Sequence, residues 1–412
     1  MKPVETLLKS SARWFLVVLA LGVWLRSAFV WLYNPGPFTW GDLIHAHSHT
    51  AYFGWAGLGL MGLILYVLPR LTGRPLETPR QLKWQLSLAP WAVGGSLVTF
   101  ALWGYVGPSI AFSTLNEVLW FWFAWVFWVN VRGRPVRQWP AALWLLGAAV
   151  LMLLVSTLGT VLVVLFRVAF PVSDAVLGNA GIYLFLQTYG DGWLELGVLG
   201  VAAALAGGLS NRRLAAWQVW LALLTMVPAT LRLLVPFGVA GPLAAVGAVA
   251  GAGLGVAQVL YLVGMAEVRH RLPAAVRPWW LLAAGALAVK AVMELLPLVP
   301  GWEALAGDRN LVIAFLHLKL LTLVSAGLIG AFAYMGAAGR GFRAYAVGAV
   351  VMLAALGVVG FWGATAPLVA KASYAVAFAG AVVAAAGAYG AVWPMAVGPA
   401  REGRPAGGAV KG

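Results

Sequence analysis

The sequence predicts an all-α integral membrane protein with about twelve transmembrane helices and with both termini in the cytoplasm. Three observations predict this fold class. Apolar residues make up 62% of the chain and charged residues only 9%, whereas soluble proteins are about half apolar and about a quarter charged. Apolar runs of about 20 residues, long enough to span a bilayer core, recur along the chain. Lys and Arg concentrate in every second connection between these runs.

The expected helices follow the apolar runs in order. They lie at 13–33, 45–68, 86–107, 109–131, 141–166, 179–207, 214–236, 238–264, 279–299, 309–336, 343–366 and 369–394. The first run follows several basic residues and has no small-residue cleavage site, so we expect it to stay as a helix. No internal repeat is apparent. Residues 1–397 are expected to form a single polytopic transmembrane domain, and the Gly/Pro/Arg-rich residues 398–412 a disordered cytoplasmic tail.

Basic residues predict the orientation, because short cytoplasmic loops hold excess Lys and Arg. The basic groups are Lys2, Lys9 and Arg13; Arg70, Arg74, Arg80 and Lys83; Arg132, Arg134 and Arg137; Arg212 and Arg213; Arg269, Arg271 and Arg277; Arg340 and Arg343; and Arg401, Arg404 and Lys411. The alternate connections hold the acidic Asp42, Asp174, Glu303 and Asp308. The formal charge of +15 is spread over loops, so no nucleic-acid partner is expected. We expect a multi-pass protein of the inner (cytoplasmic) membrane, surrounded by membrane lipids.

Four of the five histidines are predicted to share one membrane depth. His45, His47 and His49 lie where the second helix begins, and His317 lies about two turns into the tenth helix, which begins on the same outer side. Neutral imidazole is the usual axial ligand of haem iron and also binds copper or zinc. The alternatives are a hydrogen bond between helices for His317 and an interfacial cluster without ligands for the other three. His270 lies in a basic loop and is expected to be solvated.

The spacing of the clustered histidines separates two faces of a helix. His45 and His49 are four residues apart and share a face, so they could donate two ligands to one copper or zinc ion. His47 points roughly the other way. Which of the three is an axial ligand stays open at this point. The chain has no Cys, which excludes iron–sulfur clusters and covalently attached haem, so only a non-covalent haem such as haem b fits.

Other ionisable residues also lie within the apolar runs. Lys290 and Glu294 are four residues apart and could pair with each other. Candidates for binding haem propionates lie near the outer ends of helices, with snorkelling of the side chain to the lipid headgroups as the alternative. These candidates are Arg26, Arg232 and Lys371. The remaining interior residues of this kind are Glu117, Asp191, Glu195 and Lys319.

Two segments resemble the haem–copper oxidase catalytic subunit, and the nitric oxide reductase branch most. The segment His47-Ser-His-Thr-Ala-Tyr-Phe-Gly-Trp55, followed by Gly62, Tyr66 and Leu68-Pro-Arg70, is similar to that family's second helix. The tenth apolar run resembles its tenth helix, where His317 stands at the second position of a His-x-His pair. The resemblance implies a low-spin haem between His47, which keeps the six-residue spacing to Phe53, and His317.

The departures from that family imply that its binuclear oxygen- or nitric oxide-reducing site is lost. Phe315 stands where a histidine would bind the high-spin haem, and the regions 183–193 and 214–236, which would supply copper ligands, contain no histidine. We expect side chains such as Tyr183, Gln187, Tyr189 and Phe315 to fill that space, because protein interiors are close-packed. An oxidase or reductase activity of its own is therefore not expected.

A second resemblance concerns a family of haem- and copper-containing membrane proteins linked to nitric-oxide tolerance. The segments His49-Thr-Ala-Tyr-Phe-Gly-Trp55 and Leu71-Thr-Gly-Arg-Pro75 are similar to its signature, His-x-His-Glu followed by Phe-Gly and by Trp-Thr-Gly-Arg-Pro. Ser48 or Thr50 stands in place of the Glu, and Leu71 in place of the Trp. This resemblance implies haem together with copper at His45 and His49.

The expected function is that of a haem-binding membrane protein in electron transfer or in nitric oxide handling or sensing. Its expected partners are nitric oxide or a redox partner protein. The haem-and-copper nitric-oxide-tolerance protein is the first alternative. The second is a solute or proton transporter, in which buried charges form a relay and the histidines titrate. That relay would consist of Glu117, Asp191, Glu195, Lys290 and Lys319.

Overall fold

The computed structural model describes residues 2–209, 211–302, 305, 307–363 and 365–398. These residues form helices joined by short connections, and no strand occurs among them. Ten of the helices are long and apolar enough to cross a membrane. The chain is therefore an all-α, multi-pass membrane protein. Glu303 and the expected tail from residue 399 on lie outside the described residues.

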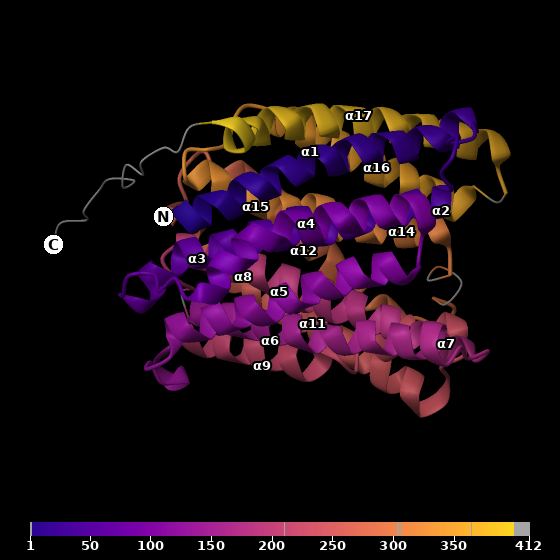
Figure 1. The fold of residues 1–412 in the computed structure, drawn as a ribbon. Coiled ribbons are helices and arrows are strands. Elements are labelled where there is room, and N and C mark those ends of the chain that lie inside the picture. The colour runs from indigo at the N-terminus through magenta and orange to yellow at the C-terminus, as the bar shows by residue number, and fades with distance from the viewer. Residues whose placement is uncertain (1, 210, 303–304, 306, 364, 399–412) are drawn as a thin grey trace.

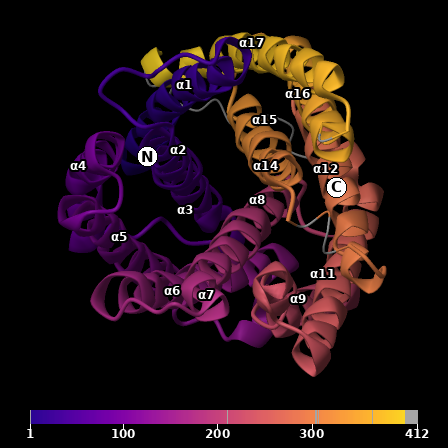
Figure 2. The same ribbon diagram turned by 90° about the vertical axis from the view of Figure 1, so that its right-hand side faces the viewer.

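An outer ring of helices surrounds three central segments (Figure 2). In spatial order, the ring contains α1 (Lys2–Trp31), α4 (Arg80–Trp103), α5 (Gly107–Val131), α6 (Ala141–Val163), α9 (Arg212–Met226), α11 (Gly241–Val268), α12 (Arg277–Met293), α16 (Phe342–Trp362) and α17 (Pro367–Val397), which packs against α1 again. Short helices at ends and connections are η2 (Val136–Gln138), η3 (Val164–Ala169), α10 (Thr230–Leu233), η5 (Val235–Phe237), η6 (Arg269–Arg271) and η7 (Leu296–Leu298).

Each central segment changes from α-helix to π-helix and back. The first consists of α2 (Trp40–His49), η1 (Thr50–Gly57) and α3 (Leu58–Thr72). The second consists of α7 (Ala175–Phe185), η4 (Leu186–Glu195) and α8 (Leu196–Leu205), and the third of α14 (Arg309–His317), η8 (Leu318–Ser325) and α15 (Ala326–Tyr334). Along the chain, the elements follow a repeating order: an outer helix, then a central segment, then two outer helices. This order occurs three times. This repeat is not apparent from the residue types.

Glycines in the π-helical stretches allow the central segments to approach their neighbours closely. A π-helix bonds each N–H to the carbonyl five residues earlier, as Leu58 does with Phe53. A Cβ added at Gly54 would lie 2.8 Å from Trp14 of α1, and one at Gly190 would lie 2.7 Å from Nζ of Lys319. Such irregular helix often marks a functional site, and here all three central segments contain it.

Each expected helix overlaps an observed one, but several ends differ by four to six residues: α2 begins at Trp40 rather than 45, and α4 spans Arg80–Trp103 rather than 86–107. Two differences are larger. α1 begins at Lys2 rather than at residue 13, because its first turns also pack inward: a Cβ on Gly62 of α3 would lie 2.6 Å from Leu8. The expected helix at 214–236 is broken, since α9 ends at Met226 and α10 begins at Thr230. Pro228 lies in this break, and proline has no N–H to continue the helical bonding.

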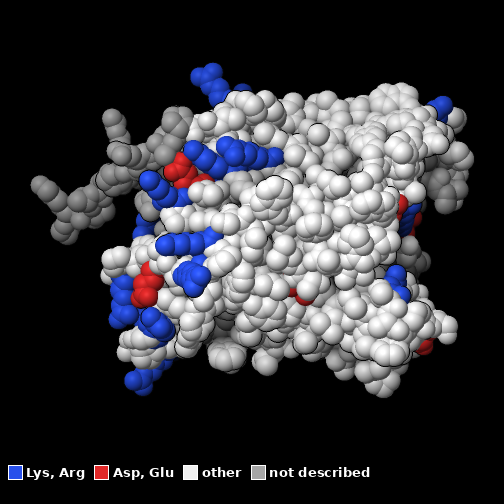
Figure 3. Space-filling view, viewed as in Figure 1, with Lys and Arg blue, Asp and Glu red and all other residues white. Residues whose placement is uncertain are grey.

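The two ends of the bundle differ in charge. Lys and Arg side chains gather at the end where α1 begins (Figure 3), and α17 ends there too (Figure 1). The first turns of α2, α7 and α14 lie at the opposite end (Figure 1). The basic groups that alternate along the sequence thus gather predominantly at one end of the molecule.

Candidate functional site

A cavity of about 210 Å³ lies between α1, α2, η1, α14, η8, α16 and α17. Most of its lining is apolar, with Phe15, Val18 and Trp55 among the contributors. An adjoining hollow of about 480 Å³ extends toward Tyr33 and Trp40, at the end of the bundle where α2 begins. The two spaces share the residues Gly22, Arg26, Ile44, His47, Ile313 and His317.

Two histidines face this cavity from different central segments. His47 lies seven residues after Trp40, where α2 begins, and His317 lies eight residues after Arg309, where α14 begins. At about 1.5 Å per residue, both are roughly 11 Å from the helix starts. Because α2 and α14 begin at the same end of the bundle (Figure 1), the histidines lie at similar depth. Both segments therefore line the same cavity, and a ligand shared by His47 and His317 stays a prediction.

The ring nitrogens of both histidines suit a ligand in the cavity. Nδ1 of His317 lies 2.8 Å from the carbonyl oxygen of Ile313 and donates to it, so Nε2 of the neutral ring carries a free lone pair. The His47 ring interacts with the backbone of Val18, but its Nδ1 is buried and has no hydrogen-bond partner in the described part of the chain, which is rare for a buried polar atom. Gly22 leaves room for the His47 ring: a Cβ there would lie 3.1 Å from Cε1.

Two arginines give the cavity a positive end. Arg26 is only 7% exposed, and its Nη1 is buried without a partner among the described residues. Arg309 lines the adjoining hollow. A buried cation without a paired anion is costly, so this end suits an acidic group. Sequence reasoning named Arg26 but missed Arg309. Arg309 lies eight residues before His317, a spacing that places both residues near the same face of a helix. This spacing could have identified Arg309.

His45 and His49 lie on another face of α2 and pack against aromatic rings. Nδ1 of His49 donates to the carbonyl of His45 at 2.9 Å, and its ring stacks on Phe100 at 4.0 Å. The His45 ring lies 4.7 Å from the Tyr105 ring. Within the described ranges, no group of three or more His, Asp or Glu side chains is placed to hold a metal ion. A metal at His45 and His49 stays a prediction.

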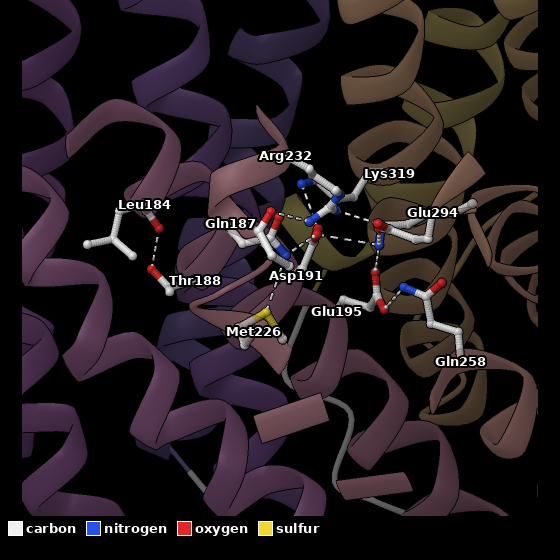
Figure 4. A network of polar contacts seen from close by, with 12 residues as sticks. Leu184, Gln187, Thr188, Asp191, Glu195, Met226, Arg232, Gln258, Glu294 and Lys319 are labelled. Carbon is white, nitrogen blue, oxygen red and sulfur yellow. Dashed lines mark hydrogen bonds and ion pairs between the residues drawn. The ribbon is translucent and has the colours of Figure 1, made fainter. Parts of the chain in front are cut away.

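A network of buried charges lies deeper in the bundle (Figure 4). Nζ of Lys290 is 2.7 Å from Glu294, 3.2 Å from Glu195 and 3.4 Å from Asp191. Nζ of Lys319, on η8, is 2.7 Å from Asp191. The predicted pairing of Lys290 with Glu294 is confirmed. These residues come from η4, α12 and its end, and η8, so the network joins segments that are far apart in sequence.

Arg232 belongs to this network and does not line the cavity near His47. Its guanidinium pairs with Glu294 and donates to the carbonyl of Ala229 at 2.6 Å. Amide groups complete the network: Gln187 donates to Asp191 and Gln258 donates to Glu195, both at 2.8 Å. The network therefore sets Lys290, Lys319 and Arg232 against Asp191, Glu195 and Glu294, so that its formal charges cancel.

The four side chains expected to fill the space between the sixth, seventh and tenth apolar runs do so only in part. Gln187 and Tyr189 are buried, and the Tyr189 hydroxyl donates to the carbonyl of Tyr52 at 2.9 Å. Tyr183 and Phe315 are half-buried, and the Tyr183 ring packs on Phe237 at 5.3 Å.

Each charged residue of the ion network was noted in the sequence. The sequence did not show that they meet in one network, because only Lys290 and Glu294 are close along the chain.

No family model and no curated protein matches this sequence. The geometry of the cavity and of the ion network therefore carries the functional argument.

Proposed function

We propose that the chain is a haem-binding protein of the inner (cytoplasmic) membrane that holds a non-covalent b-type haem between His47 and His317. One observation carries this proposal: two histidines from distant segments face a single apolar cavity at similar depth. A low-spin haem requires two axial ligands inside a largely apolar slot. When bound, the haem supplies one-electron redox chemistry, and two protein ligands leave the iron no open position. This favours electron transfer over handling or sensing of nitric oxide.

The residues around the cavity have distinct parts in holding such a group. The Ile313 carbonyl orients the His317 ring and makes its free nitrogen a better ligand. Because Gly22 has no side chain, the His47 ring fits beside it. Arg26 and Arg309 would hold the acidic edge of the haem, because guanidinium groups bind carboxylates in a bidentate manner.

The same proposal includes about twelve membrane crossings, with both termini in the cytoplasm. Besides the ten long apolar helices, the segments 175–205 and 212–237 would each cross once. The arrangement of one outer, one central and two outer helices, repeated three times, supports this count. The gathering of Lys and Arg at the end where α1 begins supports the orientation (Figure 3).

We further propose a degenerate relationship to the haem–copper oxidase catalytic subunit, in which the ion network takes the place of the reactive site. That resemblance implies a reactive metal site between the sixth, seventh and tenth helices. Here η4, α10 and η8 contribute Asp191, Arg232 and Lys319 to a network of balanced charges in this region. Ion pairs in place of metal ligands fit a protein that carries electrons and does not reduce oxygen or nitric oxide.

A transporter is the second candidate, and the ion network is the observation that favours it. Carboxylates and lysines deep in a membrane bundle commonly belong to ion or proton pathways. In this network, however, every charge has a partner of opposite sign within 4.0 Å. Fixed, balanced pairs fit a structural role better than a relay does.

A visible spectrum of the purified protein tests the proposal. Protein made in haem-sufficient cells should show a sharp Soret band and, after reduction, split α and β bands. Carbon monoxide should leave this spectrum unchanged, because both axial positions are occupied. A protein that stays colourless, even after incubation with haemin, would contradict the haem proposal and favour the transporter.

Replacing Arg26 with Gln should lower the haem reduction potential. A buried positive charge near the iron favours the reduced state, so its loss should shift the midpoint by roughly 60 mV to lower values, a tenfold change in a one-electron equilibrium. A redox titration followed at the α band measures this shift. Arg167→Gln is the matched control, because Arg167 is exposed on η3 and binds Gly178 and Asn179 away from the cavity. Equal potentials in R26Q and R167Q would contradict the role of Arg26.

A further inference from the structure

A second pocket, of about 810 Å³, opens at the basic end of the bundle. It lies between the ends of α3, α8 and α15, the connection from α5 to α6, and the start of α9. Arg70, Arg134 and Arg212 line it from three separate parts of the chain. Leu71, Ala142 and Leu205 are among the apolar residues beside them. The pocket thus combines a cationic part with an apolar part.

The three arginines lack acidic partners. In the described part of the chain, none of them lies within 4.0 Å of a carboxylate. They donate instead to neutral oxygens: Arg134 to the Leu71 carbonyl at 2.6 Å, Arg70 to the Tyr66 hydroxyl at 3.0 Å, and Arg212 to the Arg137 carbonyl. A guanidinium has more N–H groups than these bonds use, so donors remain for an anion.

Aromatic rings and these hydrogen bonds hold the guanidinium groups in place. The Arg70 guanidinium lies 4.8 Å from the Tyr66 ring and 5.3 Å from the Tyr334 ring. The Arg212 guanidinium lies 5.2 Å from the Trp144 ring. Stacking of this kind fixes a side chain that is otherwise mobile, so binding an anion costs little further entropy. The pocket is therefore preorganised for a negative charge.

We propose that this pocket binds the phosphate group of an anionic phospholipid. Guanidinium groups match phosphate oxygens in a bidentate manner, and basic pockets between transmembrane helices on the cytoplasmic side bind anionic headgroups. The basic end of the bundle is where such headgroups would lie (Figure 3). The apolar lining distinguishes a lipid from free phosphate, since acyl chains can cover Leu71, Ala142 and Leu205 and inorganic phosphate cannot. The site is independent of the haem cavity at the other end.

Lipid titration of the delipidated, full-length protein tests this site. Native mass spectrometry should show binding of phosphatidylglycerol and, at the same concentrations, much less binding of phosphatidylcholine. In the triple variant R70Q/R134Q/R212Q, the Kd for phosphatidylglycerol should rise about a hundredfold, at roughly fivefold for each basic residue. R70Q alone should raise it roughly fivefold; it removes the bond to the Tyr66 hydroxyl and the contacts with the Tyr66 and Tyr334 rings.

Matched variants separate this pocket from general surface charge. R80Q/R137Q/R213Q removes the same charge from exposed arginines outside the pocket lining, and it should leave the Kd within about twofold of the wild type. R70K/R134K/R212K keeps the charge but loses the planar guanidinium groups, so it should recover only part of the affinity. Equal loss in the pocket and control triples, or an unchanged Kd in R70Q, would overturn the site. Competition by inorganic phosphate at the same concentration as the lipid would overturn the assignment to a phospholipid.

Discussion

His47→Ala and His317→Ala should each abolish the low-spin haem spectrum. Removing either ligand leaves the iron five-coordinate or empties the site. Because the cavity is apolar and no other described histidine lines it, neither ring has a substitute. The Soret position, the reduced α band and the haem content per protein measure the loss. His270→Ala is the matched control, since His270 is exposed in η6 and should leave the spectrum unchanged.

The other clustered histidines decide between the two resemblances. His45→Ala and His49→Ala should keep the low-spin spectrum, because these rings pack on Phe100 and Tyr105, away from the cavity. They would lose a bound copper or zinc ion if the pair holds one, which metal analysis of the same preparations measures. A colourless His49→Ala variant beside a red His47→Ala variant would favour the nitric-oxide-tolerance alignment instead.

Lys290→Met should destabilise the protein strongly. The Lys290 ammonium group lies among three buried carboxylates, and its removal leaves uncompensated negative charge inside the bundle. Breaking one side of a buried pair costs about 3–5 kcal/mol. Unfolding in increasing sodium dodecyl sulfate, followed by helical circular dichroism, measures this change. The control Lys371→Met removes an exposed lysine and should change the free energy of unfolding by less than about 0.5 kcal/mol.

A compensating double variant tests whether charge balance is the reason. Lys290→Met with Glu195→Gln removes one charge of each sign, so the remaining network stays neutral. This double variant should be more stable than Lys290→Met alone, because changes in one network are not additive. If the double variant is as unstable as the sum of its single changes, balanced charge does not explain the network. If Lys290→Met unfolds like the wild type, the network has no structural role.

The sequence alone predicted the class of protein, the approximate position of most helices and the similar depth of His47 and His317. These features follow from patterns along the chain: apolar runs have the length of a bilayer, and basic loops alternate with acidic ones. Depth also follows from position in a run, because each residue advances a helix by a fixed rise. For His47 and His317, position in the run predicted a similar depth and an interior face, whereas their pairing was implied by the resemblance; the structure places both at one cavity.

Only the tertiary structure decided which helices are central, where the charges pair and which arginines reach the cavity. In a membrane, residues that face lipid and residues that face other helices are equally apolar, so composition does not reveal the packing partner. Arg232 illustrates this, since its place near a helix end suggested the cavity, but α10 packs against α11 and its guanidinium reaches Glu294 at the end of α12. The ion pairs of Lys290 with Asp191 and Glu195 on η4 could not be predicted from the sequence either. Contacts across the bundle depend on how the central segments bend through their π-helical stretches.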